Sequence, residues 1–531
     1  MTDPYPAPRH PGYLLGQRVS SAEELVPIAR DRAHRWYSRA GLAPVHSGDR
    51  VLIVTYPDQD RLVLDAVRAA LLEMGAEDVD WLDVTDIGFS QQTYSAADGW
   101  REITDKLDAM TEQGVEFCME ATLLQRYLHD RSGYTSVYVG EAGRPHWRRT
   151  TSGAFRNNWL YNTYESFISR SHSVPDPLWQ LIDQLVIERF RTAAAVRVTD
   201  PQGTDIGWQV TEEQAGLWAD GALISGHILG STIQGIRFAF GADEFIRQAE
   251  ILMPTLNGVV AGTGNHTGYH PHITVTVERG MIASIQGGGR YGDLWREVMD
   301  RYRDVQYPGF PYKGWAYFND ASIGTNPKGH RHIEGLWANA QPWTNLPERT
   351  RAGVVHFGFG AEHWDRGFLD YAREHHLPTM HFPHVHSYFP TMAIRQRGSG
   401  EWVPVIDKGW LTVLDDPRVV RLAEIYGDPD EVLGYDWIPA IPQINYPGDY
   451  QRDYAADPVP WIDRDQQSEF ADATSEQRVL QSVAVHQKLT SLMPPRGSVH
   501  RRAAIDDERL PGDEVAVGRQ EEHHRSHHVL R

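Results

Sequence analysis

The chain has 531 residues, of which 41% are hydrophobic, and a formal net charge of -20, so it can fold as two or three domains. Its acidic balance opposes binding to nucleic acids and to anionic membranes. A lone cysteine, Cys118, excludes an intrachain disulfide framework, and with neither a signal-peptide pattern nor a run of about 20 apolar residues we expect a soluble, cytoplasmic protein.

The first part of the chain predicts a parallel α/β unit. Residues 1–18 are rich in proline, glycine and tyrosine and indicate an irregular arm, after which 22–40 carry apolar residues at helical spacing. A buried strand over 51–56, a helix over 58–76 and a strand over 79–84 follow in the order that is typical of a βαβ unit. No glycine-rich loop follows the first strand, so nucleotide binding there is unsupported.

A change of pattern near residue 190 predicts a domain boundary. The preceding residues, from about 95, are helical and aromatic in pattern, whereas 195–211 alternate and turn like a hairpin. The fold class is therefore α/β, with an N-terminal βαβ-type domain and a β-rich α+β domain. The predicted divisions are an arm and helix over 1–47, an α/β domain over 48–190, a metal-binding catalytic domain over 191–415, an extension over 416–464 and a disordered tail over 465–531.

Histidines concentrate in the β-rich domain. Twelve of the 25 histidines lie between His266 and His386, and neutral imidazole is the commonest transition-metal ligand. His384 and His386 alternate in HVHSYF, so on a strand both side chains point to one face. Their positions are then about 7 Å apart, which suits the chelation of one metal ion. DASIGTNP and HFGFG place Asp320 and His356 beside small residues that let the backbone approach a metal. This pattern predicts a metalloenzyme.

Other histidines are weaker candidates. His270 and His272 share a strand face, and they either line the same pocket or belong with His266 to a surface turn. His330 and His332 follow the DASIGTNP segment and could hold a substrate carboxylate or phenolate.

Motifs of other enzyme classes are missing or misplaced. The GGGRYG segment at 287–292 matches a dinucleotide pattern but lies far from the βαβ unit, so we expect a strand-to-helix turn there. HExxH, GxSxG and P-loop motifs do not occur, which leaves zincin, α/β-hydrolase and nucleotide triphosphatase functions without their signatures.

Several ordered blocks resemble the thermophilic metallo-aminopeptidases, the group called aminopeptidase T. The blocks AVRVTDPQGTDIGW, QAEILMP, ITVTVERGMIASIQGG, DASIGTNP, AGVVHFGFG and HFPHVHS occur in similar order and spacing, within a region from about Gly48 to Lys408. The resemblance extends to a related enzyme, 2,5-dihydroxypyridine 5,6-dioxygenase, which uses one non-haem iron. It implies the fold of that family and a homodimer.

The resemblance also implies a set of metal ligands: Glu250, Asp320, His356, His363, His384 and His386. Three of them depart from the peptidase pattern, because Asp320 stands in place of Glu, His363 in place of Tyr and His386 in place of Asp. Each keeps a donor atom, but imidazole in place of a bridging carboxylate removes negative charge and a group able to span two ions. We therefore expect one or two divalent transition-metal ions, Zn, Mn, Co or Fe(II).

Two reactions compete as the function. The preferred one is hydrolysis, in which metal-activated water attacks an amide of a peptide or a specialised small molecule, and the presence of Glu250 and His356 favours it. The alternative is a mononuclear non-haem iron dioxygenase acting on a hydroxylated aromatic or other small chelating substrate, with Asp320, His384 and His386 as a 2-His-1-carboxylate triad. A third is a non-catalytic metal- or ligand-binding protein. Candidate catalytic residues are His330, His332 and His363.

Overall fold

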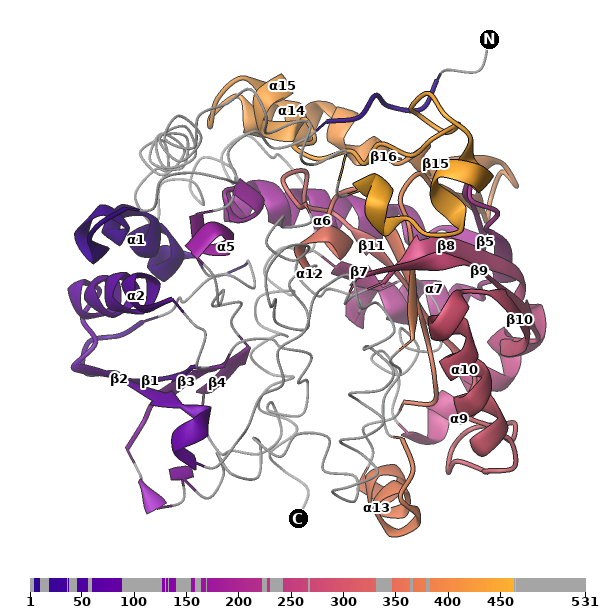
Figure 1. Ribbon diagram of the computed structural model, residues 1–531, viewed down its shortest axis with the longest axis horizontal. Coiled ribbons are helices and arrows are strands. Elements are labelled where there is room, and N and C mark those ends of the chain that lie inside the picture. The colour runs from indigo at the N-terminus through magenta and orange to yellow at the C-terminus, as the bar shows by residue number, and fades with distance from the viewer. Residues whose placement is uncertain are drawn as a thin grey trace. The chain divides into compact units, whose positions relative to one another are not determined.

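The computed structural model describes residues 4–9, 19–35, 37, 45–55, 60–87, 127–128, 130–131, 133–139, 154–157, 164–168, 170–221, 227–229, 242–265, 268–330, 346–362, 366–378, 383–462 and 464 (Figure 1). The described residues all belong to one compact unit, which lies within Met1–Thr490. The predicted tail over 465–531 lies outside the described residues. None of the described helices is long and apolar enough to cross a membrane.

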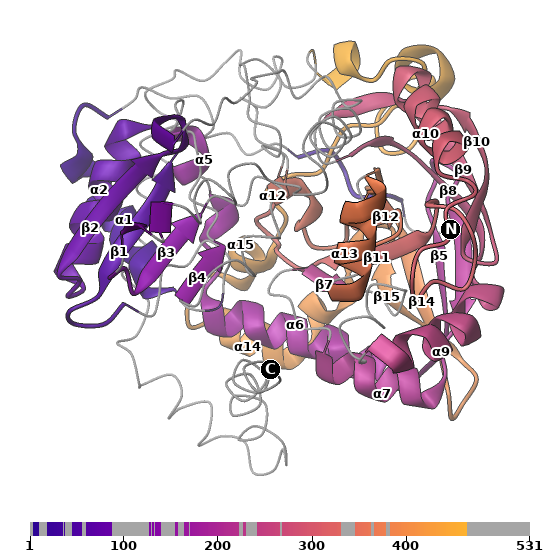
Figure 2. The ribbon, with the colours of Figure 1, turned by 90° about the horizontal axis from the view of Figure 1, so that it is seen from below.

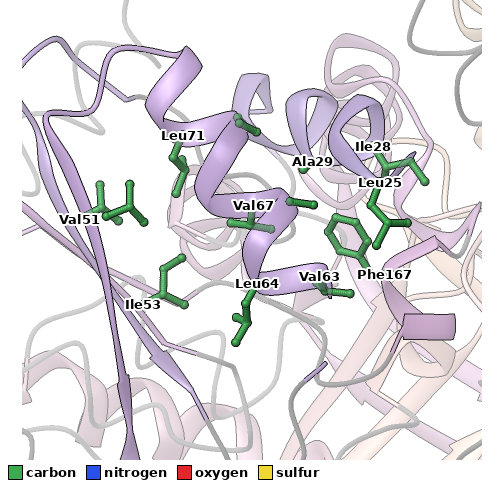
Figure 3. Packing of buried hydrophobic residues seen from close by; sticks show 14 of the residues in the cluster. Leu25, Ile28, Ala29, Val51, Ile53, Val63, Leu64, Val67, Leu71 and Phe167 are labelled. Atoms are coloured by element: carbon green, nitrogen blue, oxygen red, sulfur yellow. The ribbon is translucent and has the colours of Figure 1, made fainter. Parts of the chain in front are cut away.

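The N-terminal elements form the predicted βαβ unit. They are η1 (Ala22–Glu24), α1 (Val26–His34), β1 (Arg50–Thr55), α2 (Arg61–Glu73), β2 (Asp78–Asp83) and η2 (Val84–Ile87). Asp60 caps α2, because its carboxylate accepts hydrogen bonds from the backbone N–H groups of Leu62 and Val63. The apolar face of α2 packs between β1 and α1, where Val67 and Leu71 are fully buried (Figure 3). Each such side chain contributes about 1.5–3 kcal/mol of burial free energy.

Two further strands extend this sheet where the sequence indicated helix. They are β3 (Ser136–Val139) and β4 (Ala154–Asn157), and the sheet has the parallel strand order β2-β1-β3-β4. The helical prediction was wrong for these segments, because strands of four residues are too short to establish a period of two. It is confirmed for the end of the region, which holds α5 (Tyr164–Ile168), η4 (Arg170–His172) and α6 (Asp176–Phe190).

The β-rich part of the chain contains a large antiparallel sheet of order β10-β9-β8-β6-β5-β14-β15-β16. Its strands are β5 (Ala193–Thr199), β6 (Asp205–Gln209), β8 (Asn257–Gly264), β9 (Tyr269–Glu278), β10 (Met281–Gly287), β14 (Thr391–Gln396), β15 (Trp402–Asp407) and β16 (Trp410–Leu411). The predicted hairpin over 195–211 is confirmed as β5 and β6. A parallel sheet followed by a large antiparallel one agrees with the predicted α/β class.

The predicted strand-to-helix turn at 287–292 is also confirmed. Strand β10 ends at Gly287, and α10 (Gly289–Arg301) begins two residues later. Gly287 has a φ of +72°, and a Cβ added there would lie 2.3 Å from the carbonyl oxygen of His272. Only glycine combines this backbone conformation with this close approach.

A smaller antiparallel sheet, here called the histidine sheet, has the order β13-β12-β11-β7. Its strands are β7 (His227–Leu229), β11 (Phe318–Gly324), β12 (Val355–Phe359) and β13 (His384–Ser387), and Figure 2 shows β11 beside β12. Strand β13 packs on β8 of the large sheet. A Cβ added at Gly262 would lie 2.7 Å from Cγ1 of Val385, so the two strands approach as closely as glycine allows.

The remaining helices surround these sheets and complete the C-terminal extension. They are α7 (Glu212–Gly221), α9 (Ala242–Leu252), η5 (Met253–Thr255), α12 (Leu346–Arg349), α13 (Arg366–His375), η6 (Thr412–Asp415), α14 (Pro417–Ala423), α15 (Pro429–Leu433) and the π-helix η7 (Gln451–Ala455). The extension is anchored by buried Lys328, whose Nζ donates to the carbonyl oxygens of Glu431 and Gly434 and lies 3.1 Å from Oδ1 of Asp436.

Candidate metal centre

The register of the histidine sheet places the predicted donors on one face. His356 of β12 pairs with His386 of β13 on one side and with Ser322 of β11 on the other. In the neighbouring row, Gly358 pairs with His384 and with Asp320. Residues two apart on a strand share a face, as do directly paired residues, so both rows present their side chains together. The donors therefore gather from three segments that are distant in the sequence.

The donor face is buried. Asp320, His356, His384 and His386 each expose 2% or less of their surface. Nε2 of His356 lies 3.6 Å from Oδ2 of Asp320, which is the diagonal neighbour in the pairing. The centre of the His356 ring lies 5.7 Å from that of His384 and 6.1 Å from that of His386. A polar face this deep in a protein requires compensating interactions, which a bound ion would supply.

Burial keeps His356 neutral. Removal from water lowers the pKa of His356 to about 4, although the nearby Asp320 carboxylate acts in the opposite direction. A neutral imidazole has a nitrogen lone pair available at neutral pH, which is the form that binds a metal.

A carboxylate that the sequence did not reveal holds His386. Glu348 of α12 is fully buried, and its Oε1 lies 2.8 Å from Nδ1 of His386. When Glu348 is ionised it only accepts hydrogen bonds, and Nδ1 of His386 then carries the proton while Nε2 is the acceptor nitrogen. Metal-bound histidines commonly donate their second ring N–H to a carboxylate in this way. No motif marks Glu348, because it lies eight residues before His356 in a segment without periodicity.

The donor set fits the predicted transition metals in its chemistry. Three imidazoles and one carboxylate suit Zn, Fe, Mn or Co, and two imidazoles on one ion have ring centres roughly 5–6 Å apart. Ser322, buried on the same face, has no hydrogen-bond partner for its Oγ among the described residues. Among those residues no three His, Cys, Asp or Glu side chains form a ready-made metal cluster. Binding therefore requires rotation of side chains, while the strand register already brings the donors together.

The other predicted ligand in the described residues lies elsewhere. Glu250 belongs to α9, where its side chain is exposed to solvent. The structure does not place it on the buried face of the histidine sheet. His363 lies outside the described residues, so its predicted role stays a prediction.

The weaker histidine candidates have varied surroundings. His330 is fully buried, with Nδ1 3.0 Å from the carbonyl oxygen of Lys328. The ring of His270 stacks on that of Tyr291, with ring centroids 4.4 Å apart. The Tyr291 hydroxyl donates to the backbone carbonyl oxygen of His384 and accepts from the backbone N–H of the same residue. His272 contacts the carbonyl oxygen of Gln202. His266 and His332 lie outside the described residues.

A separate groove of about 360 Å³ lies on the large sheet. Its lining includes Arg197, Asp205, Gln209, Asn257 and the half-exposed Trp402. None of the predicted donors lines it, so it is distinct from the candidate metal centre.

Comparison with known proteins gives distant structural likenesses. No family model and no curated protein matches the chain. A 2,5-dihydroxypyridine dioxygenase from Pseudomonas putida KT2440 aligns with a TM-score of 0.38 and 12% identity, over 74% of this chain and 98% of that one. Wild-type AmpT from Thermus thermophilus aligns with a TM-score of 0.37 and 11% identity, over 74% and 99%. Scores this low do not assign an activity, so the function rests on the residues themselves.

Proposed function

We propose that this chain is a metalloenzyme with one transition-metal ion on the buried face of the histidine sheet. The ion is held by donors drawn from Asp320, His356, His384 and His386. The observation that carries the proposal is the strand register, which gathers a carboxylate and three histidines on one face. A single ion is favoured over two because Glu250, the further carboxylate expected for a dinuclear centre, is exposed on α9.

The reaction that this donor set supports best is oxygenation of a small chelating substrate by non-haem iron. Asp320, His384 and His386 would hold an iron as two histidines and one carboxylate, the donor set of non-haem iron oxygenases, with His356 beside them on the same face. The iron, when bound, supplies the one-electron chemistry that activates dioxygen. This reverses the preference expected from the sequence, in which Glu250 and His356 together favoured hydrolysis.

The protein's own contribution is to orient the donors and to exclude water. Glu348 keeps the proton of His386 on Nδ1 and thereby directs Nε2 toward the donor face. Gly358 lies between Asp320 and His384 in its row and puts no side chain of its own between those two donors. The burial of all four donors makes each electrostatic contact stronger than it would be in water.

Metal analysis of protein purified without oxygen tests the proposal. We expect about one iron per chain in the wild type and loss of most of it in His384→Ala and His386→Ala. His172→Ala is the matched control, because His172 is also buried but contacts Ser171 rather than the donor face. Wild-type iron content in both donor variants would contradict the assignment of the centre.

Hydrolysis remains the second candidate, and one observation favours it. The contact between Glu348 and His386 is the carboxylate–histidine arrangement that is also common around catalytic zinc. In that case the bound ion would lower the pKa of a water molecule that attacks an amide. Oxygen uptake with hydroxylated aromatic substrates and hydrolysis of amino-acid amides, measured on the same iron- and zinc-loaded samples, separate the two reactions.

A further inference from the structure

Tyr388 connects the candidate metal centre to the C-terminal extension. Its hydroxyl donates a hydrogen bond of 2.8 Å to Oε1 of Glu348, the same oxygen that contacts His386. All three side chains are fully buried. Because one carboxylate oxygen accepts from both side chains, the tyrosine fixes the rotamer of Glu348 and, through it, the orientation of the imidazole.

Tyr388 is itself confined on several sides. A Cβ added at Gly264 of β8 would lie 2.1 Å from the tyrosine hydroxyl, so this strand touches Tyr388 directly. The ring of Trp437 meets the tyrosine ring edge to face, with centroids 5.9 Å apart. Arg351 donates from Nη2 to the tyrosine carbonyl oxygen at 2.6 Å. The tyrosine therefore has little freedom to turn away from Glu348.

The extension also contacts Arg351. The guanidinium carbon of Arg351 lies 5.4 Å from the ring centres of both Tyr435 and Trp437. The Tyr435 hydroxyl accepts a hydrogen bond from the backbone N–H of Leu411, which fixes the ring in place. Contacts of this kind between a cation and aromatic faces are stronger when they are shielded from water.

We propose that Tyr388 is a positioning residue for His386, and that Trp437 of the extension holds Tyr388 in its working position. The inference rests on the proposed metal centre. It assigns a role to the extension, which is to keep one ligand of the centre oriented. The expected consequence is weaker metal binding when either aromatic residue is changed, although neither side chain is a ligand.

The first test is a double-mutant cycle with Co(II) as the probe. We expect Tyr388→Phe to raise the Kd for Co(II) roughly tenfold and to shift the visible absorption of the bound ion. Groups that orient a metal ligand through hydrogen bonds change metal affinity by such factors. In a Glu348→Ala background the same change should have no further effect, since the tyrosine acts through that carboxylate. Circular dichroism and urea unfolding show whether each variant is folded.

The second test compares two buried tryptophans of the extension. Trp437→Leu should weaken Co(II) binding, whereas Trp461→Leu should leave it unchanged, because Trp461 bonds to the carbonyl oxygen of Ala440 and packs on Tyr446. Both changes should lower stability, so the difference between them isolates the positioning role. Equal effects of the two variants on Co(II) binding would overturn the role of Trp437.

The outcomes separate this inference from the proposed function. Wild-type affinity and spectrum in Tyr388→Phe overturn the inference while the metal centre stands. A wild-type chain that binds no Co(II), Zn(II) or Fe(II) overturns both. Weaker binding in Tyr388→Phe that persists unchanged in the Glu348→Ala background shows that the tyrosine acts by another route, and also overturns the inference.

Discussion

Gly358 puts no side chain of its own between two donors. It stands between Asp320 and His384 in the strand pairing, and any side chain there would project onto the same face. We predict that Gly358→Ala lowers metal affinity by roughly tenfold or more while the chain stays folded, because the added methyl group occupies the space where the donors converge. Calorimetric titration with Zn(II) measures the effect. Gly398→Ala is the control, since a Cβ added there meets nothing within 4 Å, and it should bind like the wild type.

Asp200 provides a pH-dependent test of stability. Its carboxylate, in the turn between β5 and β6, accepts hydrogen bonds from the backbone N–H groups of Gln202 and Phe389. Burial nevertheless raises the pKa of Asp200 from 3.8 to about 6. A carboxyl with a higher pKa in the folded chain binds its proton more tightly when folded, so this contribution to stability is full below pH 3.8 and is lost as the pH rises through 6.

We predict that the wild type loses roughly 2–3 kcal/mol of unfolding free energy relative to Asp200→Asn between pH 4 and pH 7. The asparagine cannot ionise, so its own pH profile lacks this component. Urea unfolding of both proteins at several pH values, followed by tryptophan fluorescence, gives the difference. Parallel profiles for the two proteins would show that the carboxyl titrates as it does in water.

At the residue scale the sequence predicted which side chains share a face, but it did not predict which residues form hydrogen bonds with them. The alternation of His384 and His386 is local, so it survives folding and is confirmed by the register of β13. Glu348 reaches His386 only through tertiary folding across 38 residues, and a single sequence contains no signal for such a contact. A short motif alone predicts Glu250 as a metal ligand. The motif does not reveal that Glu250 lies on the solvent-exposed side of α9.

At the scale of elements, the packing of β13 on β8 depends on glycine. A Cβ added at Gly262 would lie 2.7 Å from Cγ1 of Val385 and 2.8 Å from the carbonyl oxygen of His386. We predict that Gly262→Ala destabilises the chain by about 1–3 kcal/mol through overpacking, and that it weakens metal binding because β13 must move. Urea unfolding and Zn(II) titration measure the two effects.

Gly216 of α7 gives the opposite expectation. A Cβ added there meets nothing within 4 Å, and glycine within a helix costs about 0.5–1 kcal/mol relative to alanine. Gly216→Ala should therefore raise the free energy of unfolding by about that amount and leave Zn(II) binding unchanged. A loss of stability in this variant would mean that α7 is not helical at this position.

The sequence predicts long elements better than short ones, and it does not predict pairings between strands that are distant in the sequence. α2, α6 and α10 carry apolar residues over three or more turns, and the sequence predicts helix in each of these regions. β3 and β4 are short, and each is a strand only through its pairing with a neighbour: β3 pairs with β1, and β4 pairs with β3. The insertion of β14 between β5 and β15 joins residues almost 200 positions apart, which no local pattern indicates.

At the scale of the whole molecule, the C-terminal extension packs on the rest of the chain, and the sequence predicts a disordered tail after it. The N-terminal arm pairs with the extension, since Arg9 and Ile438 exchange backbone hydrogen bonds of 2.9 and 2.7 Å. Lys328 also depends on the extension, because burial lowers its pKa while Asp436 counteracts that shift. After residue 465 the composition is polar, which predicts a disordered tail.

We predict that a chain ending at residue 470 keeps the unfolding free energy and the metal affinity of the full chain. A chain ending at residue 433 should fail to fold, because it leaves Lys328 buried without Asp436 and removes the aromatic contacts of Arg351. A buried cation that loses its partner typically costs 3–5 kcal/mol, a large share of the stability of one domain. Solubility, circular dichroism and Zn(II) titration of the two truncated chains measure the contrast. A soluble, folded chain ending at 433 would contradict the anchoring role of the extension, and loss of metal binding in the chain ending at 470 would instead assign a role to the tail.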